Sequence, residues 1–511
     1  MLRTSSCIVA MSAIILPLAS SAMAQKAKDT LRYPIQEAQS ILDTYLSPGS
    51  FANLWEPSVY DNLLAFDPAK GQHVSALVKS WSQPNDRTYE LELREDVTWH
   101  DGQKFTADDV VYTLNYLIDP NVRLRLKPSW AWIKSVEKLS PTKVRVIAGE
   151  PVPDGLMWLS FGTPIYPRHV HEPLADKQAF GARPVGTGPY RIAKIDKNTG
   201  IVAEKHAGFV PGPITPAASI GRVVSEPMED YGTQTASLLA GKADIVVDLP
   251  INEATALKDT GKFDILLAPP RVGYIFLQFP NAAWAKSKPL SDVRVRNAIV
   301  KAIDRKVLLQ VSYGPLASQL EPTEALCSKQ QLGCGYTKMV PSYDPEGAKK
   351  LLTEAGYPDG FDVAITAYRD NVADATAISG MLRKIGVRMS VKPIHSSQRL
   401  KAVQSGDVEV GYFGWSGGNM FSVAPQIMRH FQIGEYQDAE LQKLVAPIST
   451  IANDVDRRKV AANAFDYLND TAYAFAMVPR REIFTVTPEV RINASNELRA
   501  AQISPHLFAW K

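Results

Sequence analysis

Residues 93–110 read LREDVTWHDGQKFTADDV, and they are the most informative stretch of the chain. From Thr88 up to this stretch apolar and polar residues alternate, which predicts a strand with one buried face. The pair Asp101-Gly102 then predicts a tight turn. Thr106 is a good helix N-cap, and apolar residues follow it at helical spacing, so the next element is an amphipathic helix packed on a core. The stretch therefore predicts strand, turn and helix in succession.

The same alternation of helices and strands continues along the chain. One helix is expected after Asp292, ending near Gly314, and another after Asp344, ending at Gly356. Short apolar strands are expected at Lys143 to Ala148, Ala243 to Val247, Phe361 to Thr366, Val387 to Val391 and Val408 to Phe413. Interleaved helices and strands predict an α/β protein with more than one sheet.

Composition and charge exclude several classes of protein. The chain has 511 residues, of which 45% are hydrophobic and 21% charged, and this composition is typical of a globular protein. Its formal net charge is only +3, and the charges are spread along the sequence. A nucleic-acid-binding protein or a protein bound to anionic lipid would show a basic patch, so neither partner is expected.

The first 24 residues have the three zones of a secretory signal peptide. A short basic start contains Arg3, an apolar stretch runs from Cys7 to Leu18, and small residues end it at Ala22-Met23-Ala24. A retained membrane anchor is the alternative, but it needs about 20 apolar residues and Pro17 cuts this stretch short. We therefore expect cleavage after Ala24 and a mature chain in the periplasm.

Two cysteines remain in the expected mature chain, Cys327 and Cys334, in a segment of polar residues and glycine. In an oxidising compartment a pair this close predicts a disulfide that closes a small loop. Two free buried thiols are the alternative. A zinc site is not expected, because no further cysteine or histidine ligand lies nearby.

Several further motifs, taken in order, resemble one family. Besides residues 93–110 they are Tyr60-Asp61-Asn62-Leu63-Leu64, Val185-Gly186-Thr187-Gly188-Pro189-Tyr190, Asp292-Val293-Arg294-Val295-Arg296-Asn297-Ala298 and Ala355-Gly356-Tyr357-Pro358-Asp359-Gly360-Phe361. The chain resembles the extracellular solute-binding proteins of the dipeptide, oligopeptide and nickel ABC importers, family 5. The resemblance covers essentially the whole expected mature chain.

The resemblance implies a bilobal α/β periplasmic-binding-protein fold of class II, cluster C, with an extra subdomain in the first lobe. On this chain it places a signal peptide at 1–24, lobe I at 25–273 with the subdomain at about 63–184, and lobe II at 274–478. A C-terminal segment, 479–511, is expected to return to lobe I. The crossings are expected near Tyr274 to Phe279 and near Met477 to Arg480.

The resemblance also implies a function. It predicts a monomer that closes its two lobes on a small-molecule solute and then docks on the permease subunits of an ABC importer. No cofactor, resident metal or catalytic reaction is expected for such a protein.

One motif favours a different function. Gly414-Trp415-Ser416-Gly417-Gly418 matches the G-x-S-x-G turn of a serine hydrolase, and Asp438 and His506 follow in the required order. A secreted serine hydrolase using Ser416 therefore stays open as an alternative. In the resembled family, however, Gly-Trp follows the same strand and the tryptophan stacks over the ligand, so we prefer a binding loop.

The candidate ligand contacts lie in loops at strand ends. Trp415 is the main one, as an aromatic platform beside glycines that let a ligand approach the backbone. Tyr368 offers a stacking ring and Arg369 an anion-binding fork, while Asn419 both donates and accepts hydrogen bonds. Tyr45 lies in a loop that lines the first lobe in the family. The candidate set is Trp415, Gly417, Gly418, Asn419, Tyr368, Arg369 and Tyr45, and an ordinary surface or core position is the alternative for the last four named.

The chain departs from the peptide-binding members at one position. Those members carry an aspartate shortly after Gly-Trp that pairs with the free α-ammonium of a peptide, and Gly418 stands there in this chain. An ammonium buried without a carboxylate costs several kcal/mol. Simple peptides with free N-termini are therefore not expected as ligands, whereas a sugar derivative, an opine-like conjugate or another small polar metabolite is. A carboxylate from elsewhere, such as Asp370, is the remaining route to a peptide ligand.

His169 and His171 form an H-x-H motif, which supplies two possible metal ligands. The sequence identifies no third or fourth ligand for them. We therefore expect both histidines on the solvated surface of lobe I.

Overall fold

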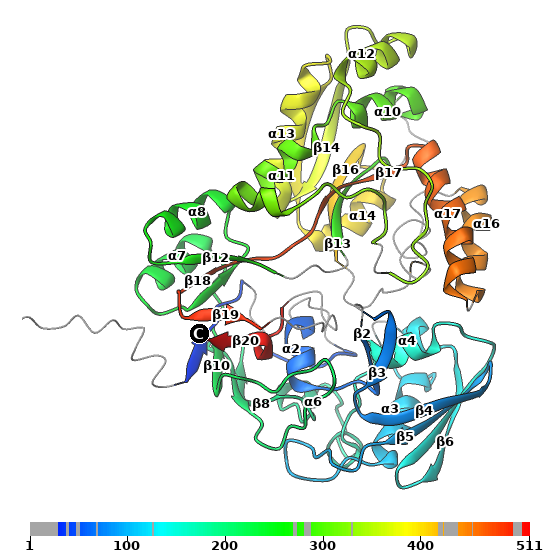
Figure 1. Ribbon diagram of the computed structural model, residues 1–511, viewed down its shortest axis with the longest axis vertical. Helices are drawn as coiled ribbons and strands as arrows, with labels where there is room; N and C mark the ends of the chain where they lie inside the picture. The colour runs from blue at the N-terminus through cyan, green and yellow to red at the C-terminus, as the bar shows by residue number, and fades with distance from the viewer. Residues whose placement is uncertain are drawn as a thin grey trace, which may run out of the picture.

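The computed structural model describes residues 29–36, 40–46, 52–67, 70–124, 127–268, 273–280, 288–328, 331–416, 423, 438–451, 453–493 and 503–511. The expected signal peptide, 1–24, lies outside these ranges. Figure 1 shows two lobes, one above the other, joined on the side of the chain's C-terminus. We call the lower part lobe I and the upper part lobe II. Within the described ranges, no helix combines the length and apolar character needed to cross a bilayer.

Lobe I contains a four-stranded sheet and a three-stranded sheet. The first has the order β1 (Thr30–Arg32), β10 (Arg222–Ser225), β9 (Gly200–Lys205) and β8 (Tyr190–Asp196). The second has the order β11 (Ile245–Val247), β18 (Ile483–Val486) and β12 (Asp264–Leu267), and it carries α7 (Tyr231–Leu239) and α8 (Ile251–Asp259). The C-terminal strands β19 (Val490–Ile492) and β20 (Phe508–Trp510) pair beside these sheets.

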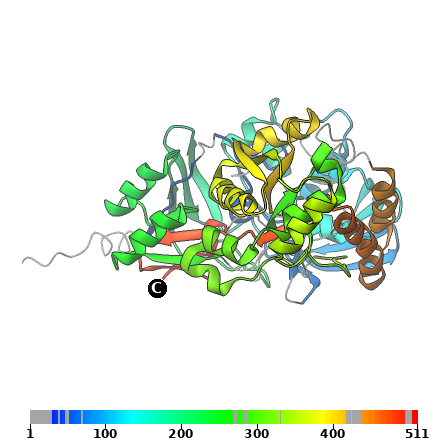
Figure 2. The same ribbon diagram turned by 90° about the horizontal axis from the view of Figure 1, so that it is seen from above.

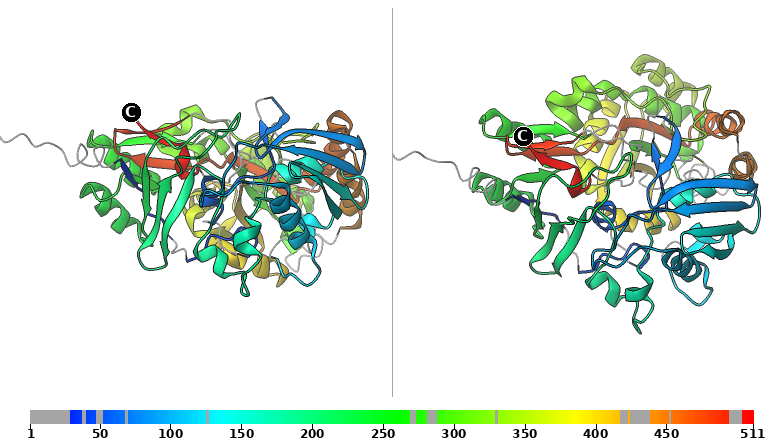
Figure 3. Two further views of the ribbon diagram at one scale, coloured as in Figure 1. Left: turned by 90° about the horizontal axis from the view of Figure 1, so that it is seen from below. Right: turned by 60° about the horizontal axis from the view of Figure 1, so that its bottom comes forward.

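The run from β2 to α6 is inserted between β1 and the other strands of the first sheet. It contains the hairpin of β2 (Leu64–Asp67) and β3 (Gln72–Ser75), and a sheet of order β4 (Val78–Asn85), β5 (Thr88–Leu93), β7 (Lys143–Ala148) and β6 (Ile133–Ser140). Its helices include α3 (Ala107–Ile118), α4 (Gly155–Ser160), α5 (Arg168–His171) and α6 (Ala179–Ala182), and α2 (Ala52–Val59) precedes it. Figure 3 shows this blue and cyan run on the side of lobe I opposite the red β19 and β20.

The structure confirms the strand, turn and helix predicted from residues 93–110. Along β5 buried residues alternate with partly buried ones, as the sequence pattern requires for a strand with one core face. Thr106 caps α3 in a capping box with Asp109, whose carboxylate also accepts a hydrogen bond from the Thr106 backbone N–H at 2.9 Å. Because both the cap and the apolar face are local features, this unit was readable from sequence alone.

Lobe II is built on a five-stranded sheet of order β15 (Arg388–Ile394), β14 (Asp362–Tyr368), β16 (Val410–Ser416), β13 (Gly273–Gln278) and β17 (Ala474–Pro479). Its helices are α9 (Lys288–Ser291), α10 (Val293–Lys301), α11 (Arg305–Tyr313), α12 (Pro345–Glu354), α13 (Val372–Arg383), α14 (Arg399–Gln404), α16 (Ala439–Val445) and α17 (Asp454–Asp470). Figure 2, seen from above, shows the yellow and green helices gathered around this sheet, with α16 and α17 at one side.

The helix expected from Asp292 to Gly314 is in fact two helices, α10 and α11. The break comes at Asp304, whose side chain accepts hydrogen bonds from the backbone N–H groups of Lys306 and Val307 and so caps a new helix. An aspartate at this place offers the backbone a start signal that the continuous apolar pattern hides.

The chain passes from lobe I to lobe II between β12 and β13 and returns between β17 and β18. The expected first crossing, Tyr274 to Phe279, overlaps β13 itself and so lies just after the passage. The second, Met477 to Arg480, reaches the return segment. The domain boundaries set out above remain our proposal.

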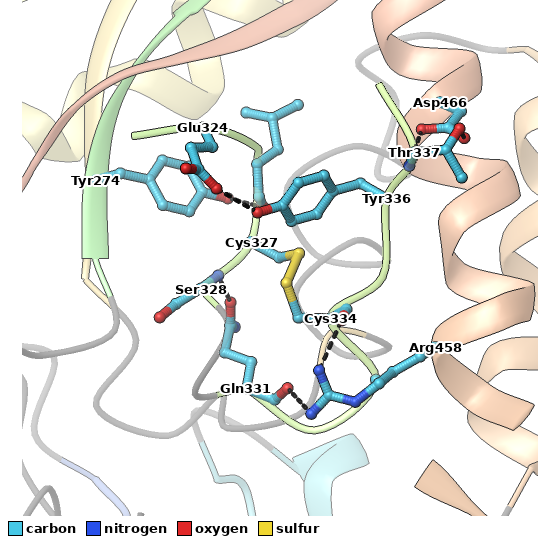
Figure 4. The surroundings of a disulfide bond; sticks show 12 residues. Tyr274, Glu324, Cys327, Ser328, Gln331, Cys334, Tyr336, Thr337, Arg458 and Asp466 are labelled. Atoms are coloured by element: carbon cyan, nitrogen blue, oxygen red, sulfur yellow. Dashed lines mark hydrogen bonds between the residues drawn. A yellow bond between two sulfur atoms is a disulfide. The ribbon is translucent and has the colours of Figure 1, made fainter. Parts of the chain in front are cut away.

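Cys327 and Cys334 form a disulfide, as predicted. Figure 4 shows the closed loop beside α17. Arg458 of that helix donates hydrogen bonds to the backbone carbonyls of Cys334 (2.8 Å) and Gln331 (3.5 Å), and the Asp454 carboxylate accepts one from Gly333 N (2.6 Å). The disulfide loop is therefore fastened to α17.

We expect protein isolated from an oxidising compartment to carry this disulfide. Alkylation without reduction should leave both thiols unmodified, and reduction before alkylation should add two labels to the intact mass. Two labels on the unreduced sample would contradict the prediction.

A buried carboxyl in lobe II makes a pH-dependent prediction. Asp374 of α13 accepts hydrogen bonds from Ser312 Oγ (2.9 Å) and Tyr412 OH (3.0 Å), and burial raises its pKa from 3.8 to about 6. A folded-state pKa above the unfolded value means that the stability from this group is present below about pH 4 and is lost as the pH rises through about 6. The Asp374→Asn variant has no such titration.

The unfolding free energy of Asp374→Asn, relative to wild type, should therefore rise by roughly 3 kcal/mol between about pH 4 and pH 7.5. Urea denaturation of both proteins across this range measures the difference. Parallel pH profiles for the two proteins would mean that Asp374 does not titrate in the folded state as described.

Candidate functional site

One edge of the lobe II sheet faces lobe I. β14 runs parallel to both β15 and β16, so the carboxyl ends of these three strands lie at the same edge. β13 is antiparallel to β16, so the first residues of β13 lie at this edge. β17 is antiparallel to β13, so the last residues of β17 lie there too. In open α/β sheets ligands bind outside the carboxyl ends of the strands. We therefore take this edge, next to the two passages between the lobes, as the candidate site.

The structure places part of the predicted site at this edge. Trp415 is the penultimate residue of β16, and its backbone is paired with Tyr274 of β13. Tyr368 ends β14, is half-buried and has its ring 5.0 Å from that of Phe413. Arg369 follows it directly and is exposed. The other three predicted residues of the loop, Gly417, Gly418 and Asn419, lie outside the described residues.

Tyr45 has a different position from the one expected. Its side chain is only 1% exposed, and its hydroxyl donates a hydrogen bond to the Pro164 carbonyl at 2.5 Å. Its ring lies 4.9 Å from that of Tyr166 and 5.3 Å from that of Trp130. The ring and the polar tip of Tyr45 are thus both in contact with residues inside lobe I, so we assign it to the core and not to solute contact.

Arg480 lies at the same edge and was not singled out by the sequence. It directly follows β17, and its guanidinium lies against the backbone of Gly414 in β16. A Cβ at position 414 would be 2.5 Å from Arg480 Nη1, so any other residue there would displace the guanidinium from this position. Gly414, one residue before Trp415, was the available signal in the sequence for a close approach of another group. That group, Arg480, is 66 residues away along the chain and could not be identified from the sequence.

Asp248 brings an acidic group to the same place from lobe I. It follows β11 with a positive φ of 52°, and its Oδ1 accepts a hydrogen bond from Ile483 N at 2.9 Å on the return segment. The side chain is exposed, yet the surrounding protein desolvates it and raises its pKa. The charge of Arg480 acts against this increase and that of Asp370 adds to it.

A buried ion pair joins the two lobes at another point. Arg457 Nη1 of α17 lies 2.5 Å from Asp154 Oδ1 at the N-terminus of α4, and the two side chains are 2% and 10% exposed. Arg457 Nε also donates to the Ile451 carbonyl at 2.8 Å. Figure 1 shows α17 standing directly over α4. The lobes are therefore in contact on this side, with both charges removed from water.

The H-x-H motif does not form a metal site among the described residues. His169 Nε2 lies 2.6 Å from Asp101 Oδ2 near the surface, as expected. His171 was expected there too, but it is fully buried with its Nδ1 2.5 Å from Tyr112 OH. Burial lowers its pKa to about 4, so it is neutral at pH 7. In a helical turn residues two apart point to different sides, which explains the difference.

The hydrolase alternative requires Asp438 and His506 to approach Ser416. Asp438 caps α16 in lobe II and accepts hydrogen bonds from Tyr467 OH (2.9 Å) and Tyr473 OH (3.1 Å). His506 is buried in lobe I with its Nδ1 2.9 Å from Ser58 Oγ. The acid and the histidine lie in different lobes, so the structure does not assemble this triad.

Two hollows within the described residues are too small for a solute. One lies in lobe I beside Asp61, Arg94 and Thr187, and another lies in lobe II beneath Val340 and Phe465. Each has room for about one water molecule. The sheet edge between the lobes therefore remains the candidate.

Comparison with known proteins places this architecture in a family. The model of the bacterial extracellular solute-binding proteins, family 5, matches residues 72–432. Heme-binding protein A of Haemophilus influenzae is 28% identical over 405 residues, covering 73% of this chain and 71% of that protein. Glutathione-binding protein GsiB of Escherichia coli (strain K12) is 26% identical over 389 residues, covering 73% and 72%.

A solved structure agrees with the fold. The periplasmic binding protein AgaA of A. tumefaciens R10, in complex with agropinic acid, superposes with a TM-score of 0.71 at 21% identity, covering 94% of this chain and 99% of that one. The family match spans well over half of the chain, and the bilobal α/β fold agrees with it. The chain therefore belongs to the bacterial extracellular solute-binding proteins of family 5.

Proposed function

We propose that this protein captures a small solute between its two lobes in the periplasm and delivers it to the permease subunits of an ABC importer. The observation that carries the proposal is the family match over residues 72–432, together with a sheet whose carboxyl edge faces the other lobe. A site shared by two lobes surrounds its ligand when they close, which desolvates the ligand and completes its contacts.

The proposal includes the path to the periplasm. Residues 1–24 serve as a cleaved signal peptide in this view, and the mature chain acts as a monomer. A disulfide at Cys327 and Cys334 fits an oxidising compartment.

We further propose that the solute is not a simple peptide with a free N-terminus. Gly418 offers no carboxylate where the peptide-binding members have one, and Trp415 offers a flat face suited to sugar rings or other planar groups. The names of related proteins support a wide range of ligands, since they include heme, glutathione and agropinic acid. A sugar derivative, an opine-like conjugate or another small polar metabolite fits best.

Mass spectrometry of the solute that co-purifies with the native protein tests the proposal directly. We expect one small metabolite at a stoichiometry near one, released on denaturation. Calorimetric titration with dipeptide and tripeptide pools should show no saturable binding at or below about 1 μM, which corresponds to roughly −8 kcal/mol. Tight binding from these pools would establish a peptide-binding component with a different anchor instead.

The serine hydrolase alternative has its own control. Ser416→Ala should leave solute affinity nearly unchanged. A hydrolase would lose turnover of ester or amide substrates by several orders of magnitude in the same variant. Turnover that disappears with Ser416 would overturn the proposal.

A further inference from the structure

Four charged side chains come together at the lobe II sheet edge without a direct ion pair between them among the described residues. Arg480 and the adjacent pair Arg369 and Asp370 lie on the lobe II side, and Asp248 lies on the lobe I side. Among the residues that the structure describes, Arg480, Arg369 and Asp370 make no side-chain hydrogen bond or ion pair. The charge of Arg480 still lowers the pKa of Asp248 and that of Asp370 raises it, so these groups act on one another without direct contact.

Arg480 is held in place by its surroundings. Its backbone N–H donates a hydrogen bond to the Gly273 carbonyl at 3.1 Å, which fixes the start of the side chain beside β13. The guanidinium then extends across the sheet to Gly414, with its Cζ 3.5 Å from where a Cβ would be. The Arg480 guanidinium therefore presents a planar, positively charged set of hydrogen-bond donors next to β16, the strand that contains Trp415.

Asp248 is fixed from the other lobe. Its backbone N–H donates to the Ile483 carbonyl at 2.8 Å, while its Oδ1 accepts from Ile483 N at 2.9 Å. Ile483 is three residues after Arg480, so these hydrogen bonds tie the carboxylate to the same return segment that carries the arginine. Oδ2 has no partner among the described residues, and the side chain stays exposed.

We infer that Arg480 and Asp248 are the two charged anchors of the solute: an anionic group, such as a carboxylate, binds Arg480, and an amine binds Asp248. This inference rests on the proposed function and narrows its ligand class to zwitterionic solutes, of which amino-acid conjugates are the nearest example. Asp248 is then a carboxylate from elsewhere, which is also the remaining route to a peptide ligand, so the titration with peptide pools decides between conjugates and peptides. A neutral sugar would leave both charges desolvated and unpaired when the lobes close, at a cost that a zwitterion avoids. Arg369 and Asp370 lie at the margin, where they are exposed to solvent.

The effect on the pKa of Asp248 is consistent with this role. Desolvation raises it, which means that the carboxylate lacks a full set of compensating partners in the structure. A bound ammonium supplies the missing counter-charge.

Matched probes on the full chain test the inference. The probes are N-(1-carboxyethyl) amino acids, their dicarboxamides, which lack both carboxylates, and their N-acetyl forms, which lack the cation. Wild-type protein stripped of co-purified solute should bind the zwitterions, and each neutralised probe should bind roughly 10- to 100-fold more weakly.

The variants assign each charge to its residue. Arg480→Gln should bind the acid and the carboxamide about equally, but should still prefer the amine over the N-acetyl form. Asp248→Asn should bind the amine and the N-acetyl form about equally, but should still prefer the acid over the carboxamide. Arg388→Gln is the matched control, because Arg388 starts β15 at the opposite end of the same sheet and pairs with Asp362. It should bind all probes as wild type does.

Other outcomes separate the inference from the proposed function. If Arg480→Gln keeps the wild-type ratio between acid and carboxamide, Arg480 is not the anchor. If no zwitterionic probe binds but a neutral sugar or the co-purified solute does, the inference fails while the proposed function stands. If neither a probe nor a co-purified solute binds, the proposed function itself fails.

Discussion

Replacing Arg457 by methionine is expected to hold the two lobes apart. In the structure Arg457 is buried against Asp154 of the other lobe, and removing one partner of a buried ion pair leaves the remaining charge without compensation at a cost of about 3–5 kcal/mol. Opening the lobes returns Asp154 to water, so the cost of its unpaired charge falls on the closed arrangement, while the lost hydrogen bond to the Ile451 carbonyl affects lobe II alone. A shift of this size changes the ratio of closed to open molecules by roughly two to four orders of magnitude.

Small-angle X-ray scattering of the ligand-free variant should show a larger radius of gyration than wild type, and solute affinity should fall by a comparable factor. The double variant Arg457→Met with Asp154→Leu should recover much of the closure, because two apolar side chains of similar size replace the pair without a buried charge.

Lys459→Met is the matched control, since Lys459 lies on the same helix but is exposed and pairs only with Asp456 on that helix. It should leave scattering and affinity unchanged. An Arg457→Met protein as compact as wild type, with full affinity, would mean that the pair does not contribute to closure.

Trp415→Ala is expected to leave the fold intact and to cost about 1 to 4 kcal/mol in solute binding, as for an aromatic anchor at an interface. The reason is its place near the carboxyl end of β16, at the sheet edge that we take as the candidate site, where its backbone pairs with Tyr274. Calorimetric titration with the co-purified solute gives the affinity, and thermal unfolding reports on the fold.

Tyr343→Ala removes an exposed aromatic ring of lobe II and is the control for a general effect of losing such a ring. It should change neither measurement. Loss of most thermal stability in Trp415→Ala, with affinity retained, would show that Trp415 is a packing residue.

The features that could be predicted from sequence depend on neighbours along the chain. The cap at Thr106 and the strand before it act over a few residues, and Cys327 and Cys334 are only seven residues apart. Even local patterns have limits, since the continuous apolar stripe after Asp292 concealed the new cap at Asp304. Where two local signals compete, the side-chain hydrogen bond to the backbone decides the boundary.

The features that could not be predicted depend on which distant segments meet. Tyr45 and His171 have polar side chains that suit a surface equally well, and only the aromatic core of lobe I shows that both are buried. The Tyr45 hydroxyl has its partner there in Pro164 and His171 Nδ1 has its partner in Tyr112, each more than 50 residues away. Burial of a polar group is tolerated once such a partner exists, and the sequence does not name the partner.

By itself the sequence determined that this protein is an α/β molecule of the family 5 type, with its helices, strands and disulfide loop in order, because periodicity, caps and short loops are local. Only the tertiary structure decided that Arg480 lies on Gly414 beside Asp248, and that Arg457 meets Asp154 over a separation of 303 residues. The physical reason is that a charge has a role only once its partners and its exposure to water are known, and both are set by the packing of the two lobes.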